Sequence, residues 1–153
     1  FLPNVIVSQA LKDVKSTSIR NSNDLGKKVQ KGLDRLYAYQ HADGGWGWWK
    51  DDQTDPFMTA YVVSGLTWAK QGGYEVDESR FKIARDKLKL MLDAGTTEAG
   101  TQIDLETRAF MVYALEESGG SDKTHLEKVF AERGNLQPYG RALLALTLKQ
   151  HND

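Results

Sequence analysis

The feature that most constrains the fold of this chain is the alternation of two kinds of helical segment. Segments of the first kind are apolar on nearly all sides, and these are 57–63, 109–115 and 142–146. Segments of the second kind carry a single apolar stripe, and these lie within 25–37, 81–91 and 126–130. A helix that is apolar all round is covered on most sides, whereas a striped helix buries one face and leaves the rest in water. The alternation therefore predicts buried inner helices packed against more exposed outer helices.

Helical periodicity runs through the chain, and we find no convincing period-2 pattern of a strand. The three prolines fall at or near predicted helix starts, where a missing amide hydrogen costs least. Asp55, Asp77, Asp104 and Ser121 are placed to cap helix N-termini. The predicted helices are 3–14, 24–40, 55–71, 77–93, 103–118, 122–132 and 138–150.

The inner segments form a weak, unevenly spaced repeat, with a small residue at one shared position and leucine at another. Small residues permit a close approach of neighbouring helices. Inner helices that alternate with outer ones are the pattern of an α/α toroid, and an open α-solenoid is the alternative. We expect an all-α fold, a partial α/α toroid of the terpenoid-cyclase type with alternating inner and outer hairpins. The matched positions are Ala60, Ala109 and Gly140, then Leu66, Leu115 and Leu146.

Size and composition fit one globular domain. The chain has 153 residues, of which 40% are hydrophobic, so we treat 1–153 as a single partial toroid domain with a core. Its net charge is -1 and its basic residues are scattered among acidic ones, so we expect no nucleic-acid partner. It contains no cysteine, which excludes disulfides and thiolate chemistry within this segment. A chain that opens on Phe1-Leu2-Pro3 is expected to be cut from a longer protein.

The segment 39–49 is the most unusual stretch, because a glutamine, a glycine turn and three tryptophans follow one another closely. It resembles the Gln–Trp repeat of the terpenoid-cyclase toroids. In the structural interpretation, Gln40 bonds backbone groups at a helix end and Trp46 packs against the neighbouring hairpin. In the functional interpretation, Trp46, Trp48 and Trp49 form a candidate aromatic binding surface for a sugar or a protein partner.

Residues 51–55 match the DDxxD pattern that holds magnesium diphosphate in class I isoprenoid synthases. Here the motif lies in a predicted loop directly before Pro56, and the sequence contains no second acidic motif that could lie opposite it. We interpret it as an N-cap with further acids near a helix N-terminus.

The remaining reactive residue types form no recognisable constellation. His41, His125 and His151 share no metal-ligand spacing, and we expect all three at the surface. No nucleophile elbow, serine–lysine pair or phosphate-binding glycine loop occurs. The sequence therefore predicts no catalytic residue, no metal site and no cofactor.

The order of several segments resembles the thioester domain of the α2-macroglobulin family, and the bacterial members in particular. Residues 1–7 resemble the stretch that follows the Cys-x-Glu-Gln thioester motif, and 25–40 resemble the first outer helix. Residues 57–63 and 104–115 resemble the next two inner helices, and 137–146 resemble a segment typical of the bacterial members. The resemblance covers essentially the whole chain and rests on order and spacing, not on one decisive motif.

This resemblance implies a fold and a function. The family's thioester domain is a toroid in which a cysteine thiol is bonded to a glutamine side chain. When a proteinase cuts the bait region, the protein rearranges and the attacker is held covalently. The resemblance implies that this chain is not an enzyme, that its partners are the rest of the parent chain and, through it, proteinases, and that the parent is periplasmic, at the cell envelope or extracellular.

The chain also departs from the family pattern. It contains no Cys-x-Glu-Gln, which would lie upstream of Phe1. The loop 93–102 compares with the loop that carries a transfer histidine in complement proteins, yet it contains none, which implies direct attack by amines. The chain has fewer hairpins than the family toroid. We therefore expect open edges at helices 3–14 and 138–150 and self-association, or marginal stability, of the isolated fragment, unless the two end helices close a smaller ring.

Two other functions stay open. An enzyme built on a toroid, acting on polysaccharide or terpenoid, needs carboxylates or a base with an arginine converging on the cavity. The inner helices offer Asp104, Glu106, Arg108 and Arg141 for this purpose. A helical-repeat interaction module needs only an exposed docking surface.

Overall fold

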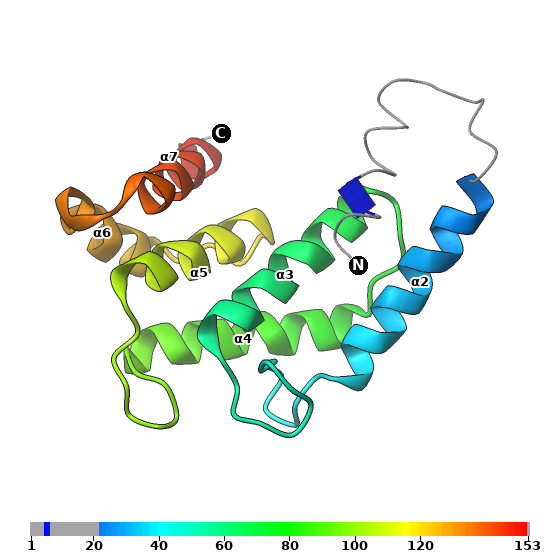
Figure 1. Cartoon of the computed structure of the whole chain (residues 1–153). Coiled ribbons are helices and arrows are strands. Elements are labelled where there is room, and N and C mark those ends of the chain that lie inside the picture. The colour runs from blue at the N-terminus through cyan, green and yellow to red at the C-terminus, as the bar shows by residue number, and fades with distance from the viewer. Residues whose placement is uncertain (1–4, 7–21, 153) are drawn as a thin grey trace.

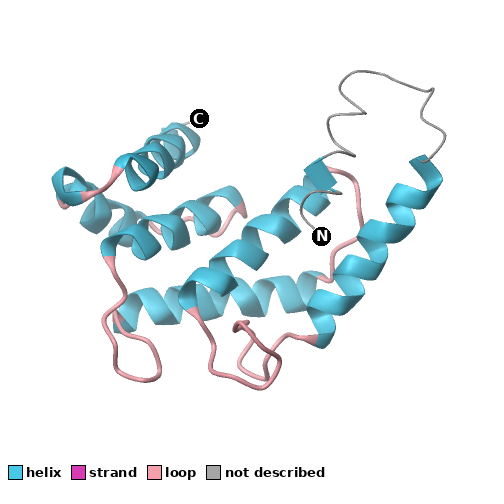
Figure 2. Ribbon diagram, viewed as in Figure 1, coloured by secondary structure: helices cyan, strands magenta, loops and turns pink. Residues whose placement is uncertain are grey.

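The helices of the computed structural model alternate as the sequence predicts (Figure 1). The structure describes residues 5–6 and 22–152, so the predicted helix 3–14 lies almost wholly outside it. Within the described residues no β-strand occurs, and one isolated bridge joins Thr96 to Gln102 (Figure 2). The helices are α2 (Ser22–Ala38), α3 (Pro56–Gln71), α4 (Glu78–Ala94), α5 (Leu105–Glu117), α6 (Lys123–Ala131) and α7 (Pro138–Asn152), with a short 3-10 helix, η1 (Arg133–Asn135), before α7.

The helices form two layers. The inner layer is α3, α5 and α7, with α5 packed on both of the others. In the outer layer α4 packs on α3 and α5, α6 packs on α5 and α7, and α2 packs on α3. Successive inner and outer helices are joined by loops, which makes the arc of an α/α toroid (Figure 2).

The core lies between the layers and is centred on α3 and α5. Fully buried side chains of these helices share one hydrophobic cluster with Leu88 of α4, and they are Val63, Leu66, Met111 and Leu115. Because most sides of α3 and α5 are covered, their sequences are apolar all round, as predicted.

The predicted small positions allow close packing of the inner helices. Ala60 and Ala109 are buried, and so is Gly140 at the start of α7. A Cβ atom at Gly140 would overlap the Glu106 carboxylate of α5 and the Leu136 side chain. A larger residue at this position would therefore force both side chains to move.

α7 is less covered than its all-round apolar sequence predicts, and its uncovered side agrees with the open edge expected at 138–150. This helix buries Leu143, Leu144 and Thr147 but exposes Ala145 and Leu146. One side of α7 packs on α5 and α6, and no further inner helix covers its other side within the described residues. The leucine position of the repeat is consequently buried in α3 and α5 but half exposed in α7.

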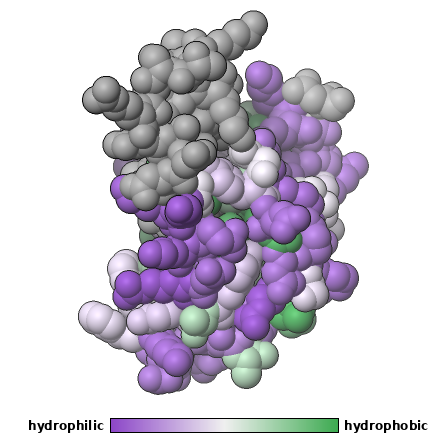
Figure 3. All heavy atoms as spheres, turned by 90° about the vertical axis from the view of Figure 1, so that its right-hand side faces the viewer, coloured by the Kyte–Doolittle hydropathy of each residue, from purple (hydrophilic) through white to green (hydrophobic). Residues whose placement is uncertain are grey.

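Helix starts follow the predicted caps with one exception. Asp55, Asp77 and Asp104 each accept hydrogen bonds from amides of the first turn that follows. At α6 the cap is Asp122, which accepts from the His125 amide, and not Ser121. The face that α2 presents to solvent is largely hydrophilic, as its single stripe predicts (Figure 3). Among the described helices, none has the length and apolarity needed to cross a membrane.

Candidate functional site

Two long loops lie at the same end of the helical layers, at the lower edge of Figure 1. Residues 39–55 lead into α3 and residues 95–104 lead into α5, so both precede the N-terminus of an inner helix. We call these two loops together the loop rim. It contains the tryptophan turn and the loop that the sequence compares with the transfer loop of complement proteins.

Trp46 is a structural residue of the rim. Its side chain is 2% exposed, and its indole Nε1 donates to the carbonyl of Leu36 near the end of α2, at 2.8 Å. Its amide donates to Thr59 Oγ1 in α3, and its carbonyl accepts from the Asp55 amide at 2.9 Å. Trp46 therefore joins the end of α2 to the start of α3, as the structural interpretation predicts, and it is not part of any exposed surface.

Gln40 holds the turn against the next helix. Its Nε2 donates to the carbonyl of Gly44, at 2.9 Å, and to the carbonyl of Arg80 in the first turn of α4, at 3.1 Å. Gly44 has a φ of 93°, and a Cβ there would overlap the Ile83 side chain of α4. The turn therefore requires glycine both for its backbone conformation and for its contact with α4.

Trp48 and Trp49 occupy the exposed tip of the turn, with 65% and 77% of their surfaces accessible. Their amides both donate to Asp52 Oδ2, at 2.9 and 3.0 Å, so the backbone that carries them is fixed. The candidate aromatic surface thus reduces to these two residues. Binding of a partner by them stays a prediction.

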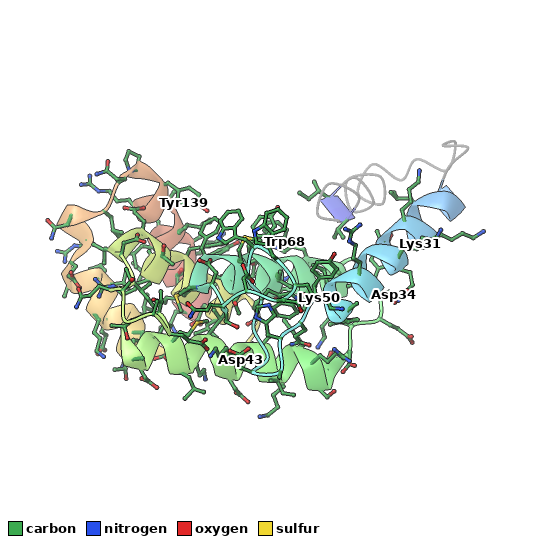
Figure 4. All side chains as sticks on the ribbon, turned by 60° about the horizontal axis from the view of Figure 1, so that its bottom comes forward. Lys31, Asp34, Asp43, Lys50, Trp68 and Tyr139 are labelled. Carbon is green, nitrogen blue, oxygen red and sulfur yellow. The ribbon has the colours of Figure 1, made fainter. Side chains whose placement is uncertain are left out.

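Lys87 of α4 connects the two loops of the rim. Its Nζ lies 2.6 Å from Asp43 Oδ2 in the first loop and 3.0 Å from Glu98 Oε1 in the second. Figure 4 views the molecule with this end forward and labels Asp43 in front of the helices. Burial disfavours the charge of Lys87, but its bonds to Asp43 and Glu98 outweigh burial and raise its pKa. Burial likewise opposes the charge of Asp43, yet bonds from Lys87, the Gly45 amide and Thr54 lower its pKa.

These shifts predict a pH window for the rim. A lowered pKa at Asp43 stabilises the fold above the ordinary carboxyl range, and this contribution is lost as the pH falls through the folded-state pKa. A raised pKa at Lys87 stabilises the fold below the ordinary lysine range, and this contribution is lost as the pH rises through the folded-state pKa. The bridge therefore stabilises the fold between these limits.

Replacing Lys87 by methionine is expected to lower the free energy of unfolding at neutral pH by about 1–2 kcal/mol. This is less than for a fully buried pair because Asp43 is one-third exposed. The variant should also lose less stability on acidification, since Asp43 loses one of the partners that lower its pKa. Urea melts at several pH values measure both effects. Lys82→Met on the same helix breaks the exposed pair with Asp86 and should change stability by under about 0.5 kcal/mol; equal effects of the two variants would contradict the bridge.

The acids and arginines considered for an enzyme have structural partners. Asp104 caps α5, and Glu106 accepts from the Gln137 amide just before α7. Arg108 pairs with Glu132 at 3.1 Å, and Arg141 donates to the carbonyl of Gly134. The DDxxD segment also has a structural role, because its last residue, Asp55, caps α3. No cluster of three or more potential metal ligands occurs in the described part of the chain.

The prediction of three surface histidines is wrong for His125 and only partly right for the others. His125 is 5% exposed, and its Nδ1 lies 2.8 Å from Asp122 Oδ2. His41 is held between Thr54 Oγ1 and the Trp49 carbonyl, and His151 lies 3.2 Å from Glu116 Oε1. The Asp-x-x-His spacing at the start of α6 is the signal that sequence reasoning missed, because a capping aspartate also reaches the side chain of the histidine three residues later.

Sequence comparison places the first part of the chain in a known family. The sequence model described as the A-macroglobulin TED domain matches residues 1–93. An α2-macroglobulin of Thermotoga maritima is 42% identical over 79 residues, which are 52% of this chain and 5% of that protein. An α2-macroglobulin homologue of Yersinia pestis is 30% identical over 122 residues, 79% of this chain and 6% of that protein. The chain therefore spans only about a twentieth of the length of these relatives.

Comparison with solved structures identifies the same family fold. A crystal structure of native Escherichia coli α2-macroglobulin, from domain MG7 to the C-terminus, matches 95% of this chain and 25% of that one. The TM-score is 0.75 at 18% sequence identity. A cryo-EM structure of the native E. coli protein matches over the same share, and 11% of that chain, with a TM-score of 0.67 at 18% identity. The chain belongs to the A-macroglobulin TED domain family and has its α/α-toroid fold.

Proposed function

We propose that this chain is part of the thioester domain of a bacterial proteinase-trapping protein of the α2-macroglobulin type, and that it does not itself carry the thioester. Residues 1–153 are then one partial toroid domain of a much longer parent. The observation that carries this proposal is the family match over 1–93, which includes the tryptophan turn that builds the loop rim.

The polar contacts at the loop rim favour a structural role for its charged and polar residues and not a catalytic one. Its histidine, His41, already has polar partners at both ring nitrogens, Thr54 and the Trp49 carbonyl. The partly buried Lys87 of α4, which joins the two loops, is paired with two carboxylates. Neither group is poised as a base for transfer, which fits a thioester that is attacked directly by amines.

In this proposal the chain is not an enzyme. Its partners are the other domains of the parent and, through the parent, proteinases. The parent acts in the periplasm, at the cell envelope or outside the cell, where foreign proteinases are met.

The test compares the isolated chain with its parent. The roughly twenty residues upstream of Phe1 in the parent gene should contain Cys-x-Glu-Gln. Incubation with labelled methylamine, followed by mass spectrometry, should then modify the parent and leave the isolated chain unmodified. A proteinase incubated with the parent should become covalently attached, and prior methylamine treatment should prevent this.

Three outcomes would each contradict a different part of the proposal. A stoichiometric methylamine adduct on the isolated chain would reveal a reactive group of its own. The absence of Cys-x-Glu-Gln from the parent would rule out covalent trapping through this domain. A methylamine-reactive parent that never captures a proteinase would rule out the trapping function.

A further inference from the structure

A groove of about 380 Å³ is open to solvent where the end of α6, η1 and α7 meet, at the upper left of Figure 1. One side of α7 supplies most of its apolar lining, through Leu144, Ala145 and Leu148, and α6 adds Phe130. Two arginines also line the groove, and no acidic residue does. The groove therefore combines an apolar floor with a positive charge.

The two arginines are exposed, and among the described residues neither has a carboxylate within ion-pair distance. Arg133 donates from Nη1 to the carbonyl of Phe130 at 2.9 Å, and its guanidinium lies 4.2 Å from the centre of that ring. Arg141 donates from Nη2 to the carbonyl of Gly134 at 3.0 Å. A guanidinium has five N–H donors, so each side chain is held in place and can still donate to a further acceptor.

The equivalent place one hairpin earlier is covered by an outer helix. There α6 packs on α5, and its His125 Nε2 lies 3.6 Å from Asp93 Oδ1 at the end of α4. Arg108, the fourth residue of α5, pairs with Glu132 directly after α6, at 3.1 Å. Arg141 is likewise the fourth residue of its inner helix, α7, but no described outer helix lies beyond it.

The helix that covers α5 shows which chemistry such a place accepts. Leu126 and Val129 of α6 are buried, and Glu132 follows three residues later. The helix thus brings an apolar side and then, one turn further on, a carboxylate for the arginine of the inner helix. A second arginine beside the groove on α7 makes a carboxylate more favourable there.

We propose that the groove beside α7 binds an amphipathic helix of a protein chain that carries an acidic residue at the end of its apolar side. The carboxylate accepts from Arg141, with Arg133 beside it, and the apolar side lies on Leu144, Ala145 and Leu148. The source of this helix rests on the proposed function, because the next outer helix of a longer toroid would occupy this place. The binding itself does not depend on thioester chemistry.

The probe is a synthetic peptide with the sequence of residues 121–134, blocked at both ends. A lactam joins the peptide's Lys123 to its Glu127, which are exposed on α6 and four residues apart. It stabilises the helix and leaves the apolar side and Glu132 free. A second peptide carries Glu132→Gln.

The ¹⁵N-labelled 153-residue chain is titrated with the peptide and followed by NMR of its backbone amides. The chain is kept at a concentration at which light scattering shows a monomer. We expect saturable shifts at 130–134 and 141–148. Shifts are not expected at 92–108, where the chain's own α6 already covers α5.

Arg141→Gln in the chain, or Glu132→Gln in the peptide, should each weaken binding about 5-fold, as for a partly exposed charged pair. The two changes together should cost no more than either alone, because both remove the same contact. Arg133→Gln should have a smaller effect. Arg35→Gln is the matched control, because Arg35 is also exposed and lies over an aromatic ring, Tyr39, but on α2; it should leave binding unchanged.

Several results would overturn the proposal. They are no saturable shift, equal binding of the two peptides, or equal effects of Arg141→Gln and Arg35→Gln. Shifts at 92–108 that depend on Arg108 would mean that the peptide displaces α6. Vesicles of anionic lipid that shift the same amides more strongly than the peptide would assign the groove to a membrane. None of these results alters methylamine uptake or proteinase capture by the parent, so the groove and the proposed function fail separately.

Discussion

Replacing Trp46 by alanine is expected to lower the free energy of unfolding by about 3–5 kcal/mol, the range for a large aromatic side chain removed from a core. The indole is buried at the junction of α2 and α3, and its Nε1 satisfies the Leu36 carbonyl. The variant therefore loses apolar burial, gains a cavity and leaves a carbonyl near the end of α2 without its donor. A urea melt followed by far-UV circular dichroism measures the change.

Trp49→Ala supplies the control within the same turn. Its side chain is 77% exposed and contributes little burial, so its loss should cost under about 0.5 kcal/mol, the usual range for a surface substitution. If Trp46→Ala and Trp49→Ala both left the free energy of unfolding almost unchanged, the structural role assigned to the turn would be contradicted.

The isolated 153-residue chain is expected to self-associate or to be only marginally stable. Leu146 is 50% exposed on α7, beside exposed Ala142 and Ala145, on the side that no described helix covers. Exposed contiguous apolar patches tend to be covered by association. Light scattering over a concentration series should show a mass that rises from one chain toward two or more. Leu146→Glu should return the mass to that of a monomer.

Leu90→Glu on α4 is the matched control, because Leu90 is also exposed, at 65%, but lies on an outer helix. It should leave the association unchanged. A monomer at high concentration with a sharp cooperative melt would contradict the open-edge picture and favour a closed smaller ring or an independent domain.

The sequence predicts helices well here because burial follows helical periodicity. Apolar residues all round α3 and α5, and one stripe on α2 and α4, distinguish the inner layer from the outer one. Helix ends are equally readable, since Asp55, Asp77 and Asp104 lie one residue before the helices that they cap.

The errors arise where burial depends on distant neighbours. The sequence of α7 is as apolar as an inner helix, but a helix is buried only where another element packs on it. His125 lies on a striped helix, yet it is buried where α6 packs on α5. The Lys87 bridge joins residues 43, 87 and 98, and only the packing of α4 across both loops brings these charges together.

The backbone pairing around Trp46 has a consequence for how the turn tolerates change. The Asp55 backbone amide donates to the Trp46 carbonyl, so a hydrogen bond closes the loop 47–54 at its base. At its tip, Lys50 and Asp51 are exposed. Such a loop can be lengthened or nicked at its exposed tip while the helices on either side keep their register. The protein therefore has a place, at Lys50 and Asp51, where new sequence can be inserted next to two tryptophans while the pairing of Trp46 with Asp55 is kept.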